Sequence, residues 1–360
     1  MRAIMMAAGK GTRLLPLTAT RPKPMMPLLN QPIMDSMLSL VKSAGIDEVT
    51  ILVDYLSEQI VSHVGDGSKF GLKVDYTADN IRRGTAGAVR NAAEGEKEPF
   101  LVVSADVLTT IDLRKMLDAH SNSNAHVTMM LASVSDTSQY GVAMLDERGR
   151  ITRFHEKPRR EDAFSNLVNA GIYVCSPDIL PSIPDDTEFD FSRQLFPLML
   201  KSGQQIGGYR FSGYWNDVGM PSTYLAATQD MVDGKLEEDA LARKNYSDEP
   251  AYGRLITGRN CHIDASASID GWAVMGDNVR IGKDVKLSRS IIYSNTQIGD
   301  SSLISEAIVG EGVSIDGAVT LDQGVVIGDG TRIGSDSRIG HNIKIWHHSR
   351  LGSGTKMLHT

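Results

Sequence analysis

The chain begins Met1-Arg2-Ala3-Ile4-Met5-Met6-Ala7-Ala8-Gly9-Lys10-Gly11-Thr12-Arg13, an apolar run followed directly by two glycines and two cations. The apolar run has the length of a strand, so the glycines should follow the carboxyl end of that strand. Backbone N–H groups in such a turn can surround a polyphosphate, and glycine lets the backbone approach phosphate oxygens without a Cβ. Arg13 offers a planar set of donors, and Lys23 offers a point charge between two prolines. The stretch therefore predicts a phosphate-binding loop, although a lone Gly-x-Gly is more often an ordinary turn.

Two common phosphate-binding motifs do not fit this loop. A P-loop requires a Gly-Lys-Ser/Thr ending, whereas Lys10 is followed by Gly11. The dinucleotide-binding pattern requires a third glycine at the position of Leu14. The loop therefore belongs to another class of phosphate site.

Composition limits the possible functions. The chain has 360 residues, 41% of them hydrophobic, which predicts a soluble globular protein with room for two domains. The net charge of −7 argues against general binding of nucleic acid or anionic membranes, so local cations must hold any anionic ligand. Neither a transmembrane run nor a signal-peptide pattern is present, and Cys175 and Cys261 are too few for a disulfide framework. We therefore expect a cytoplasmic protein.

The first half of the chain alternates β-rich runs with helical stretches up to about residue 225. Apolar residues at helical spacing predict a helix over 33–44, which Gly45 ends. This alternation predicts a mostly parallel sheet covered on both faces, with ligands bound outside the carboxyl ends of the strands. The other predicted strands cover 49–53, 100–104 and 127–131, and the other predicted helices cover 57–64 and 113–120.

After a polar stretch over 234–253, the period of the apolar residues becomes six. Such spacing is typical of a hexapeptide β-helix, in which each aliphatic fills the interior and small or polar residues form the corners. We expect a catalytic domain over 1–230, a helix or linker over 231–255 and a β-helix over 256–360. The repeat includes Ile263, Ile269, Met275, Ile281 and Leu287, a slipped register at Ile292, Ile298 and Leu303, and then Val309, Ile315, Leu321, Ile327, Ile333, Ile339, Ile345 and Leu351.

Several motifs in order along the chain give it a clear resemblance to the nucleoside-diphosphate-sugar pyrophosphorylases, also called sugar-1-phosphate nucleotidylyltransferases. In pattern it resembles most the mannose-1-phosphate guanylyltransferase-like members with a hexapeptide β-helix. The resemblance implies a Rossmann-like catalytic domain followed by a left-handed parallel β-helix. The motifs are Ala7–Arg13, Arg21-Pro22-Lys23-Pro24-Met25, Gly84-Thr85-Ala86-Gly87, Ser104-Ala105-Asp106, Phe154-His155-Glu156-Lys157-Pro158, Asn169-Ala170-Gly171 and Tyr214-Trp215-Asn216-Asp217-Val218-Gly219.

The reaction implied by the resemblance is attack of a sugar-1-phosphate oxygen on the α-phosphorus of a nucleoside triphosphate, with release of pyrophosphate. Because two anions must meet, such chemistry needs cations and positioning more than a protein acid or base. Arg13 would favour the leaving pyrophosphate and Lys23 would neutralise charge at the α-phosphate. The amides of the loop, from Ala8 and Gly9 to Gly11 and Thr12, would hold the triphosphate.

The resemblance also assigns a metal and a sugar subsite. Asp106 and Asp217 would bind Mg²⁺, which prefers oxygen ligands and substrate phosphates. Taken alone, Asp106 would serve equally well as a helix N-cap, and Asp217 equally well as a turn residue. Lys157 matches the lysine that grips the phosphate of the sugar. Glu156, Asn169 and the backbone of Gly141 match positions that contact the sugar.

The choice of base depends on fewer residues. Gly84 and Thr85 would lie in the loop on the base side, and Asp79 precedes them. A carboxylate complements the N1–H and N2–H₂ donors of guanine, whereas glutamine suits uracil or thymine better. We therefore predict GTP with mannose-1-phosphate. The alternative is dTTP or UTP with glucose-1-phosphate, and Arg82-Arg83, where relatives commonly have Pro-Leu, leaves the base open.

Two other functional classes remain open alternatives. Hexapeptide helices also occur in acyltransferases that use a histidine, and His341, His347 and His348 occupy late repeats. Only about five coils fit here, so we favour a structural β-helix that joins subunits into a homo-oligomer. The fold also serves non-catalytic regulatory relatives, but these typically lose the phosphate loop or metal carboxylates that this chain retains.

Overall fold

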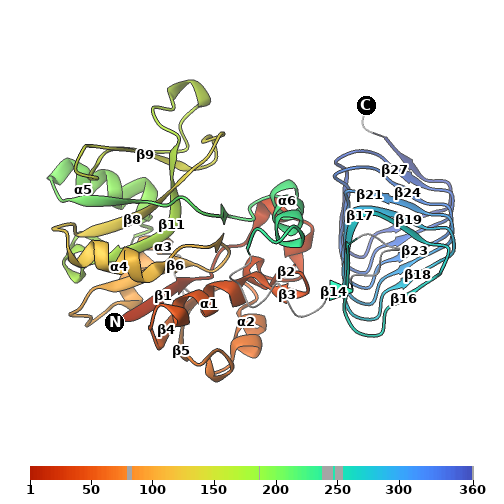
Figure 1. Cartoon of the computed structure of the whole chain (residues 1–360), viewed down its shortest axis with the longest axis horizontal. Helices are drawn as coiled ribbons and strands as arrows, with labels where there is room; N and C mark the ends of the chain where they lie inside the picture. The colour runs from red at the N-terminus through yellow and green to blue at the C-terminus, as the bar shows by residue number, and fades with distance from the viewer. Residues whose placement is uncertain (79–82, 186, 237–245, 248–253, 359–360) are drawn as a thin grey trace. The chain divides into compact units, whose positions relative to one another are not determined.

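Figure 1 shows the computed structural model of the chain, which describes residues 1–78, 83–185, 187–236, 246–247 and 254–358. The chain divides into two compact units. One unit contains residues 1–9 and 33–217, and the other contains residues 10–32 and 218–360. The segment that carries Gly11, Arg13 and Lys23 therefore belongs to the same unit as the C-terminal repeats.

The first unit is built on a nine-stranded sheet in the order β10-β9-β11-β6-β1-β4-β5, with β8 and β12 joined through β11. Strands β6, β1, β4 and β5 run parallel, so their carboxyl ends share one edge of the sheet. The strands are β1 (Arg2–Met6), β4 (Glu48–Val53), β5 (Lys73–Ala78), β6 (Phe100–Ser104), β8 (Val127–Ser133), β9 (Gly141–Leu145), β10 (Ile151–Glu156), β11 (Leu167–Cys175) and β12 (Ile206–Arg210). The four strands expected from the sequence are present.

The other half of the sheet is more antiparallel than we expected. Strand β11 runs antiparallel to β6, β8 and β9, and β10 runs antiparallel to β9. The connection between β9 and β10 covers only residues 146–150, which is too short for the crossover that a parallel pair needs. A further two-stranded ribbon pairs β7 (Leu108–Thr109) with β13 (Trp215–Asn216) in antiparallel fashion.

The three helices predicted from the sequence are present as α1, α2 and α4, whereas α3 and α5 were not predicted. Helix α1 ends next to Gly45, whose φ of 83° is the left-handed conformation that favours glycine. Helix α3 packs against β1 and β4, and α4 packs against β8, β11 and β12. The helices are α1 (Ile33–Ser43), α2 (Ser57–Val64), α3 (Gly84–Ala92), α4 (Leu113–Ser121), α5 (Phe196–Ser202), the π-helical turn η7 (Phe191–Leu195), and the 3-10 turns η4 (Ser68–Phe70), η5 (Arg160–Asp162) and η6 (Pro177–Ser182).

The second unit contains the predicted parallel β-helix, whose strands stack coil upon coil (Figure 1). Aliphatic side chains fill its interior. One face consists of β16 (His262–Ile263), β18 (Arg280–Ile281), β20 (Gln297–Ile298), β23 (Ser314–Ile315), β26 (Arg332–Ile333) and β29 (Arg350–Leu351). The other two faces consist of β15 (Arg254–Thr257), β17 (Ser268–Met275), β19 (Lys286–Ile292), β21 (Leu303–Ser305), β22 (Ile308–Val309), β24 (Thr320–Leu321), β25 (Val326–Ile327), β27 (Arg338–Ile339), β28 (Lys344–Ile345) and β30 (Lys356–Met357).

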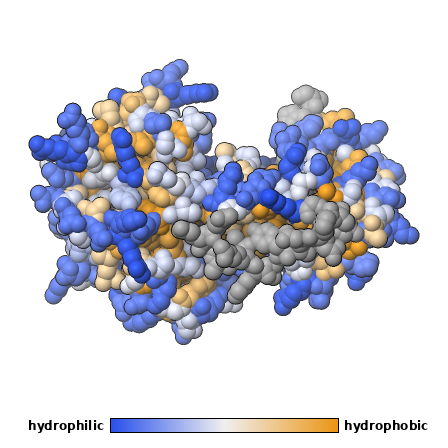
Figure 2. Space-filling model, viewed as in Figure 1, coloured by the Kyte–Doolittle hydropathy of each residue, from blue (hydrophilic) through white to orange (hydrophobic). Residues whose placement is uncertain are grey.

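Shorter elements complete the second unit. Helix α6 (Pro221–Val232) packs against β19. The remaining elements are η1 (Thr12–Leu14), η2 (Leu17–Ala19), η3 (Lys23–Met25), the hairpin of β2 (Pro27–Leu28) with β3 (Gln31–Pro32), and β14 (Tyr246–Ser247), which pairs with β15. In the view of Figure 2, both units are covered largely by hydrophilic residues, interrupted by small apolar areas.

The predicted repeat is wrong at one position, because Leu303 does not face the interior of the β-helix. Leu303 is 43% exposed, whereas its neighbour Ile304 is 1% exposed and fills the interior. Ile304 pairs in register with Leu287 and Leu321, at intervals of 17 residues instead of 18. The register therefore slips because each of two successive coils lacks one residue at a corner, first before Ile292 and again before Val309.

The three faces of the β-helix differ on their outer sides. On the face that contains β18 and β26, the outer residues Arg280 and Arg332 are exposed. On the face that contains β19, β22 and β25, the outer residues are aliphatic and buried as well. These buried outer residues are Val274, Ile291, Ile308 and Val326, each at most 2% exposed. This third face therefore requires a cover.

The slipped register gives a matched pair of stability predictions. We expect Ile304→Ala to lower the free energy of unfolding by about 2–5 kcal/mol, because it removes interior contacts and leaves a cavity. Leu303→Ala should cost about 0.5 kcal/mol or less, because its side chain is exposed. Thermal unfolding followed by circular dichroism measures both. Equal shifts for the two variants would contradict the assignment of Ile304 to the interior.

Candidate functional site

The phosphate loop leaves the sheet at the end of its central parallel strands. Met6, the last residue of β1, lies between Leu52 of β4 and Ser104 of β6. Beyond it, the Ala7 N–H donates to the Leu52 carbonyl at 3.0 Å, and the Ala105 N–H donates to the Met6 carbonyl at 3.0 Å. Residues 7–9 and 105–106 thus start from one edge of the sheet, where the sequence predicts ligand binding.

Gly11 and Lys23, which are twelve positions apart in the sequence, lie against each other. Gly11 has a φ of 61°, and a Cβ at this position would lie 3.0 Å from the Cβ of Lys23 and 3.0 Å from the Cγ2 of Thr18. The Thr18 hydroxyl donates to the Gly11 carbonyl at 2.8 Å. Only glycine therefore fits this turn, and the stem of Lys23 is buried against it.

Arg13 lies in η1 on the exposed side of the same segment. Its carbonyl accepts a hydrogen bond from the Lys344 ammonium at 3.1 Å. Arg13 also lines a cavity of about 710 Å³ in the second unit, together with Pro221 of α6 and Trp272 of the β-helix. Thr12 is likewise exposed.

The two predicted metal ligands are brought together by the small β-ribbon. Asn216 of β13 pairs with Leu108 of β7, so the next residue, Asp217, continues toward Val107 and Asp106. Asp106 itself follows β6 by two residues, next to the end of β1. Aspartates distant in sequence thus converge at the edge of the sheet where residues 7–9 begin.

Tyr140 and Trp215 surround Asp217. The Tyr140 hydroxyl donates to Asp217 Oδ1 at 3.2 Å, and the rings of Tyr140 and Trp215 meet edge to face at 5.3 Å. The Trp215 indole N–H in turn donates to the Ala170 carbonyl at 3.0 Å. Sequence reasoning missed this role of Tyr140, although an aromatic residue directly before Gly141 was visible.

Three of the predicted sugar contacts lie on neighbouring strands. Gly141 of β9 pairs directly with Glu156 of β10. A Cβ on Gly141 would lie 2.8 Å from Glu156 Oε2, so glycine leaves space for that carboxylate. Lys157 follows with a φ of 50°, and its N–H donates to the Tyr140 carbonyl at 2.9 Å. Its ammonium lies 3.9 Å from Glu156 Oε1.

Asn169 is held by neighbours within the same unit. Its amide nitrogen donates to the Tyr173 hydroxyl at 2.8 Å and to the Ser192 hydroxyl at 3.1 Å. Its carbonyl oxygen accepts from the Gly171 N–H at 3.0 Å. The amide is therefore fixed in orientation, and its oxygen retains one further acceptor position.

Gly84 and Thr85 form the first turn of helix α3. A Cβ on Gly84 would lie 2.7 Å from the Phe189 carbonyl oxygen, and the Ala86 N–H donates to the same oxygen at 3.0 Å. The Thr85 hydroxyl donates to Asp190 Oδ2 at 2.8 Å. Asp79, the predicted base-reading residue, lies outside the described residues.

Asp190 and Ser192 link the predicted base and sugar sides, and sequence reasoning missed both. Asp190 accepts from Thr85 and caps η7 through the backbone N–H groups of Ser192 and Arg193. Burial raises the pKa of Glu156, and Asp190 raises it further, while Lys157 and Arg193 act in the opposite direction. A partly buried carboxylate whose pKa is raised by burial and by a neighbouring charge is a candidate for a functional site.

The donor set at the sheet edge suits a hard divalent cation. Asp106 and Asp217 provide carboxylate oxygens, and Mg²⁺ is commonly bound by one or two carboxylates together with substrate phosphates. Among the described residues, no group of three or more His, Cys, Asp or Glu side chains is arranged to hold a metal by itself.

The mixed sheet, the glycine loop at its central strand and the convergent aspartates define a nucleotide-dependent transferase with an appended β-helix. A sequence model described as Nucleotidyl transferase matches residues 2–234, which is more than half of the chain. The chain belongs to the nucleotidyl transferase family. A second model, described as the EIF2B subunit epsilon LbH domain, matches residues 251–339, so the C-terminal repeats form a left-handed β-helix.

Curated relatives cover most of this chain. Mannose-1-phosphate guanylyltransferase of Mycobacterium tuberculosis is 33% identical over 293 residues, which are 78% of this chain and 80% of the relative. UTP–glucose-1-phosphate uridylyltransferase of Synechocystis is 31% identical over 297 residues, which are 78% of this chain and 76% of the relative. Relatives with different bases and sugars are thus similarly distant.

Solved structures share the fold over about two thirds of this chain. HddC from Yersinia pseudotuberculosis complexed with GMP-PN is 25% identical, has a TM-score of 0.55, and matches 64% of this chain and 98% of that chain. A UDP-glucose pyrophosphorylase complexed with UDP-glucose is 24% identical, with a TM-score of 0.56, and matches 66% of this chain and 99% of that one. Across the described part of the chain, no helix has the length and apolar character needed to cross a membrane.

Glu156 gives a prediction about stability and pH. Because its pKa is raised in the folded state, folding favours its protonated form, and this contribution is present below the unfolded pKa and lost as pH rises through the folded pKa. We expect Glu156→Gln to raise the melting temperature at pH 7.5 relative to the unchanged protein. The gain should shrink toward zero near pH 4.

The control for this prediction is Glu161→Gln, which changes an exposed carboxylate on η5. Its effect on the melting temperature should stay small and show little dependence on pH. Melting temperatures measured by calorimetry from pH 4 to 8 would contradict the assignment if the effect of Glu156→Gln were constant with pH.

Proposed function

We propose that this protein transfers a nucleotidyl group from a nucleoside triphosphate to a sugar-1-phosphate, giving a nucleoside-diphosphate sugar and pyrophosphate. The observation that supports this most directly is the convergence of Asp106 and Asp217 at the carboxyl ends of β6 and β1. Lys157 and Glu156 lie on the antiparallel extension of the same sheet. The names of the relatives point to the same reaction.

The roles of the cations follow from the negative charges of the two substrates, which must approach each other during the reaction. Attack of a phosphate oxygen on the α-phosphorus brings two anions together, so neutralisation and orientation supply most of the rate. Lys23, buried against Gly11, would neutralise the α-phosphate, and Arg13 would favour departure of the pyrophosphate. Lys157 would hold the phosphate of the sugar.

The predicted metal fits the carboxylates of the first unit. Asp106 and Asp217 would hold Mg²⁺, which when bound supplies positive charge to the phosphates. Tyr140 donates to Asp217 Oδ1 and so helps to orient this carboxylate. Hydrogen bonds of this kind orient the ligands of metal sites.

For the substrates, we propose GTP and mannose-1-phosphate. The M. tuberculosis relative is a mannose-1-phosphate guanylyltransferase, and a carboxylate such as Asp79 complements the donors of guanine. The alternative is dTTP or UTP with glucose-1-phosphate, and the similarity to the uridylyltransferase of Synechocystis supports it. Glu156, Asn169 and the backbone of Gly141 would contact the sugar in either case.

A substrate panel tests this choice. Pyrophosphate release is measured for GTP, UTP, dTTP, ATP and CTP, each with mannose-1-phosphate and glucose-1-phosphate. We expect the highest kcat/KM for GTP with mannose-1-phosphate. Preferred use of UTP or dTTP would contradict the guanine assignment, whereas turnover of no pair would contradict the reaction itself.

The carboxylates provide a second test. Asp106→Asn and Asp217→Asn should each lower kcat by about 100-fold or more, because electrostatic stabilisation at the reacting phosphates is lost. Each variant should also need a higher Mg²⁺ concentration for half-maximal rate. Asp112→Asn is the control, because Asp112 caps helix α4 at the Lys115 N–H. Its rate should remain unchanged, and an unaltered Asp106→Asn enzyme would remove the proposed role.

The β-helix histidines do not add support for acyl transfer. His341 and His348 are exposed, and the rings of His347 and His348 meet edge to face at 5.2 Å. We propose that the β-helix is structural, and its assembly into a homo-oligomer stays a prediction. A purely regulatory role is disfavoured because the glycine loop, its cations and the two aspartates are all retained.

A further inference from the structure

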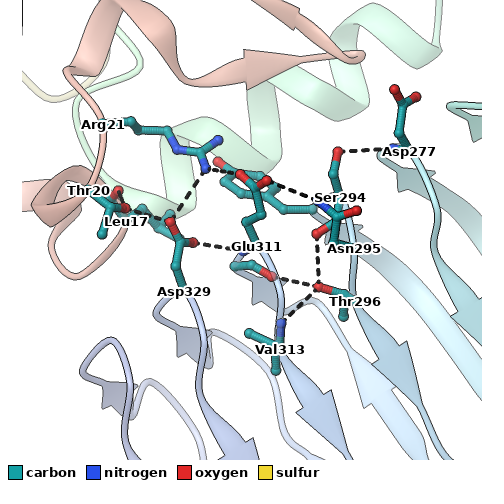
Figure 3. A network of polar contacts seen from close by, with 12 residues as sticks. Leu17, Thr20, Arg21, Asp277, Ser294, Asn295, Thr296, Glu311, Val313 and Asp329 are labelled. Atoms are coloured by element: carbon teal, nitrogen blue, oxygen red, sulfur yellow. Dashed lines mark hydrogen bonds and ion pairs between the residues drawn. The ribbon is translucent and has the colours of Figure 1, made fainter. Parts of the chain in front are cut away.

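The segment that carries Arg13 and Lys23 is attached to the β-helix at several points. Lys344 donates to the Arg13 carbonyl, and the side-chain amide of Asn30 donates to the Met275 carbonyl at 2.8 Å. Between these points, Arg21 and Thr20 contact Glu311 and Asp329 (Figure 3). These contacts come from several successive coils and span most of residues 10–32.

Arg21 is the centre of this attachment. Its Nη2 lies 2.8 Å from Glu311 Oε2 and 3.4 Å from Asp329 Oδ2, and its guanidinium lies 4.7 Å from the centroid of the Tyr293 ring. Only 15% of its side chain is exposed. Burial lowers the pKa of Arg21, but Tyr293, Asp329 and Glu311 together raise it above its ordinary value. The charge of the guanidinium is therefore balanced by two carboxylates at Nη2 in a largely buried site.

Each carboxylate divides its two oxygens between the β-helix and the loop. Glu311 Oε1 accepts from the Asn295 amide at 3.2 Å, while Oε2 accepts from Arg21. Asp329 Oδ1 accepts from the Glu311 backbone N–H at 2.7 Å, while Oδ2 accepts from Arg21 and from the Thr20 hydroxyl. In each carboxylate, one oxygen is thus held by the β-helix, and this bond orients the other oxygen toward Thr20 and Arg21.

The corner role of Asp329 is ordinary in this β-helix, but its second contact is not. At another corner, Asp300 Oδ1 accepts from the Lys283 N–H at 2.8 Å, which matches the bond from Glu311 N–H to Asp329. Stacking of coils therefore needs only one oxygen of such an aspartate. The second oxygen of Asp329 and the far end of Glu311 hold a segment from the start of the chain.

We propose that Glu311 and Asp329 are positioning residues for the nucleotide: by holding Arg21, they set the geometry of Lys23 on the triphosphate. Arg21 lies two residues before Lys23, with only Pro22 between them, and proline restricts its own φ. A shift of Arg21 is therefore passed on to Lys23. This inference rests on the proposed function, since it concerns the binding of the triphosphate in that reaction.

The first experiment measures the loop itself and needs no substrate. Hydrogen exchange of residues 10–32 is compared in the unchanged protein, in Glu311→Gln/Asp329→Asn and in Asp300→Asn. Asparagine retains an acceptor for the corner bond, so both substituted proteins should keep the β-helix. We expect faster exchange in residues 17–26 of the double variant only. Unchanged exchange there, or equal loss of protection in Asp300→Asn, would overturn the inference.

The second experiment separates positioning from a general loss of stability. With the substrate pair that the unchanged enzyme uses best, we expect the double variant to raise KM for the nucleoside triphosphate and lower kcat, reducing kcat/KM by about 10- to 100-fold. KM for the sugar-1-phosphate should change less than about two-fold, because its predicted contacts lie in the first unit. Asp300→Asn should match the unchanged enzyme in all three constants.

The two proposals fail in different ways. If the unchanged protein turns over no pair of substrates, the proposed function fails, and the exchange experiment still decides whether the carboxylates hold the loop. If the unchanged protein is active and the double variant has the same KM for the triphosphate, the positioning role is wrong. Equal rises in both KM values would also overturn it, because that result indicates a general structural effect.

Discussion

The phosphate loop depends on one constraint, the aliphatic outer side of the third β-helix face. Val274, Ile291 and Ile308 point away from the interior and are nonetheless buried. Leaving such side chains in water would forfeit about 1.5–3 kcal/mol each, so the face must be covered when the unit folds. Helix α6 contacts this face through β19, and the Tyr224 hydroxyl of α6 bonds both the Tyr293 hydroxyl and the Pro27 carbonyl. The loop therefore has a scaffold other than the strand from which it emerges.

Apolar cover alone would not define where Lys23 lies. Burial of aliphatic surface is non-directional, so it favours contact without selecting one register. Arg21 adds direction, because its planar guanidinium must meet two carboxylates and the face of Tyr293 at once. A partly buried ion pair contributes little net stability after desolvation, so we infer that the contribution of this one is to specify position. Aliphatic residues thus favour contact of the segment that carries Lys23 with the β-helix, and polar residues define the geometry of this contact.

The sequence predicts local features of this fold well, and non-local pairing poorly. Helix α1 and strand β6 follow from apolar spacing, and the hexapeptide period follows from a repeat that each coil reinforces. The antiparallel placement of β11 could not be predicted, because it depends on which strands meet after long connections. Leu303 and Ile304 are adjacent aliphatics of similar size, so only the direction of each side chain in the folded coil separates them. At the site, Asp190 and Ser192 gain their roles from contacts across the fold and carry no motif.

The sequence nevertheless contained one signal of the buried third face of the β-helix. On the exposed faces a polar residue precedes the interior aliphatic in most coils, as in Arg280-Ile281 and Arg332-Ile333, and the exception is Leu303-Ile304. On the third face two aliphatics stand together, as in Ile291-Ile292 and Ile308-Val309. A single doubled aliphatic does not show that a strand is buried on both sides, because Leu303 is exposed, but doubled aliphatics on successive coils of one face do indicate it. Where such pairs recur at the period of one coil, they mark the face on which other parts of the chain must pack, and here that face carries the segment with Lys23.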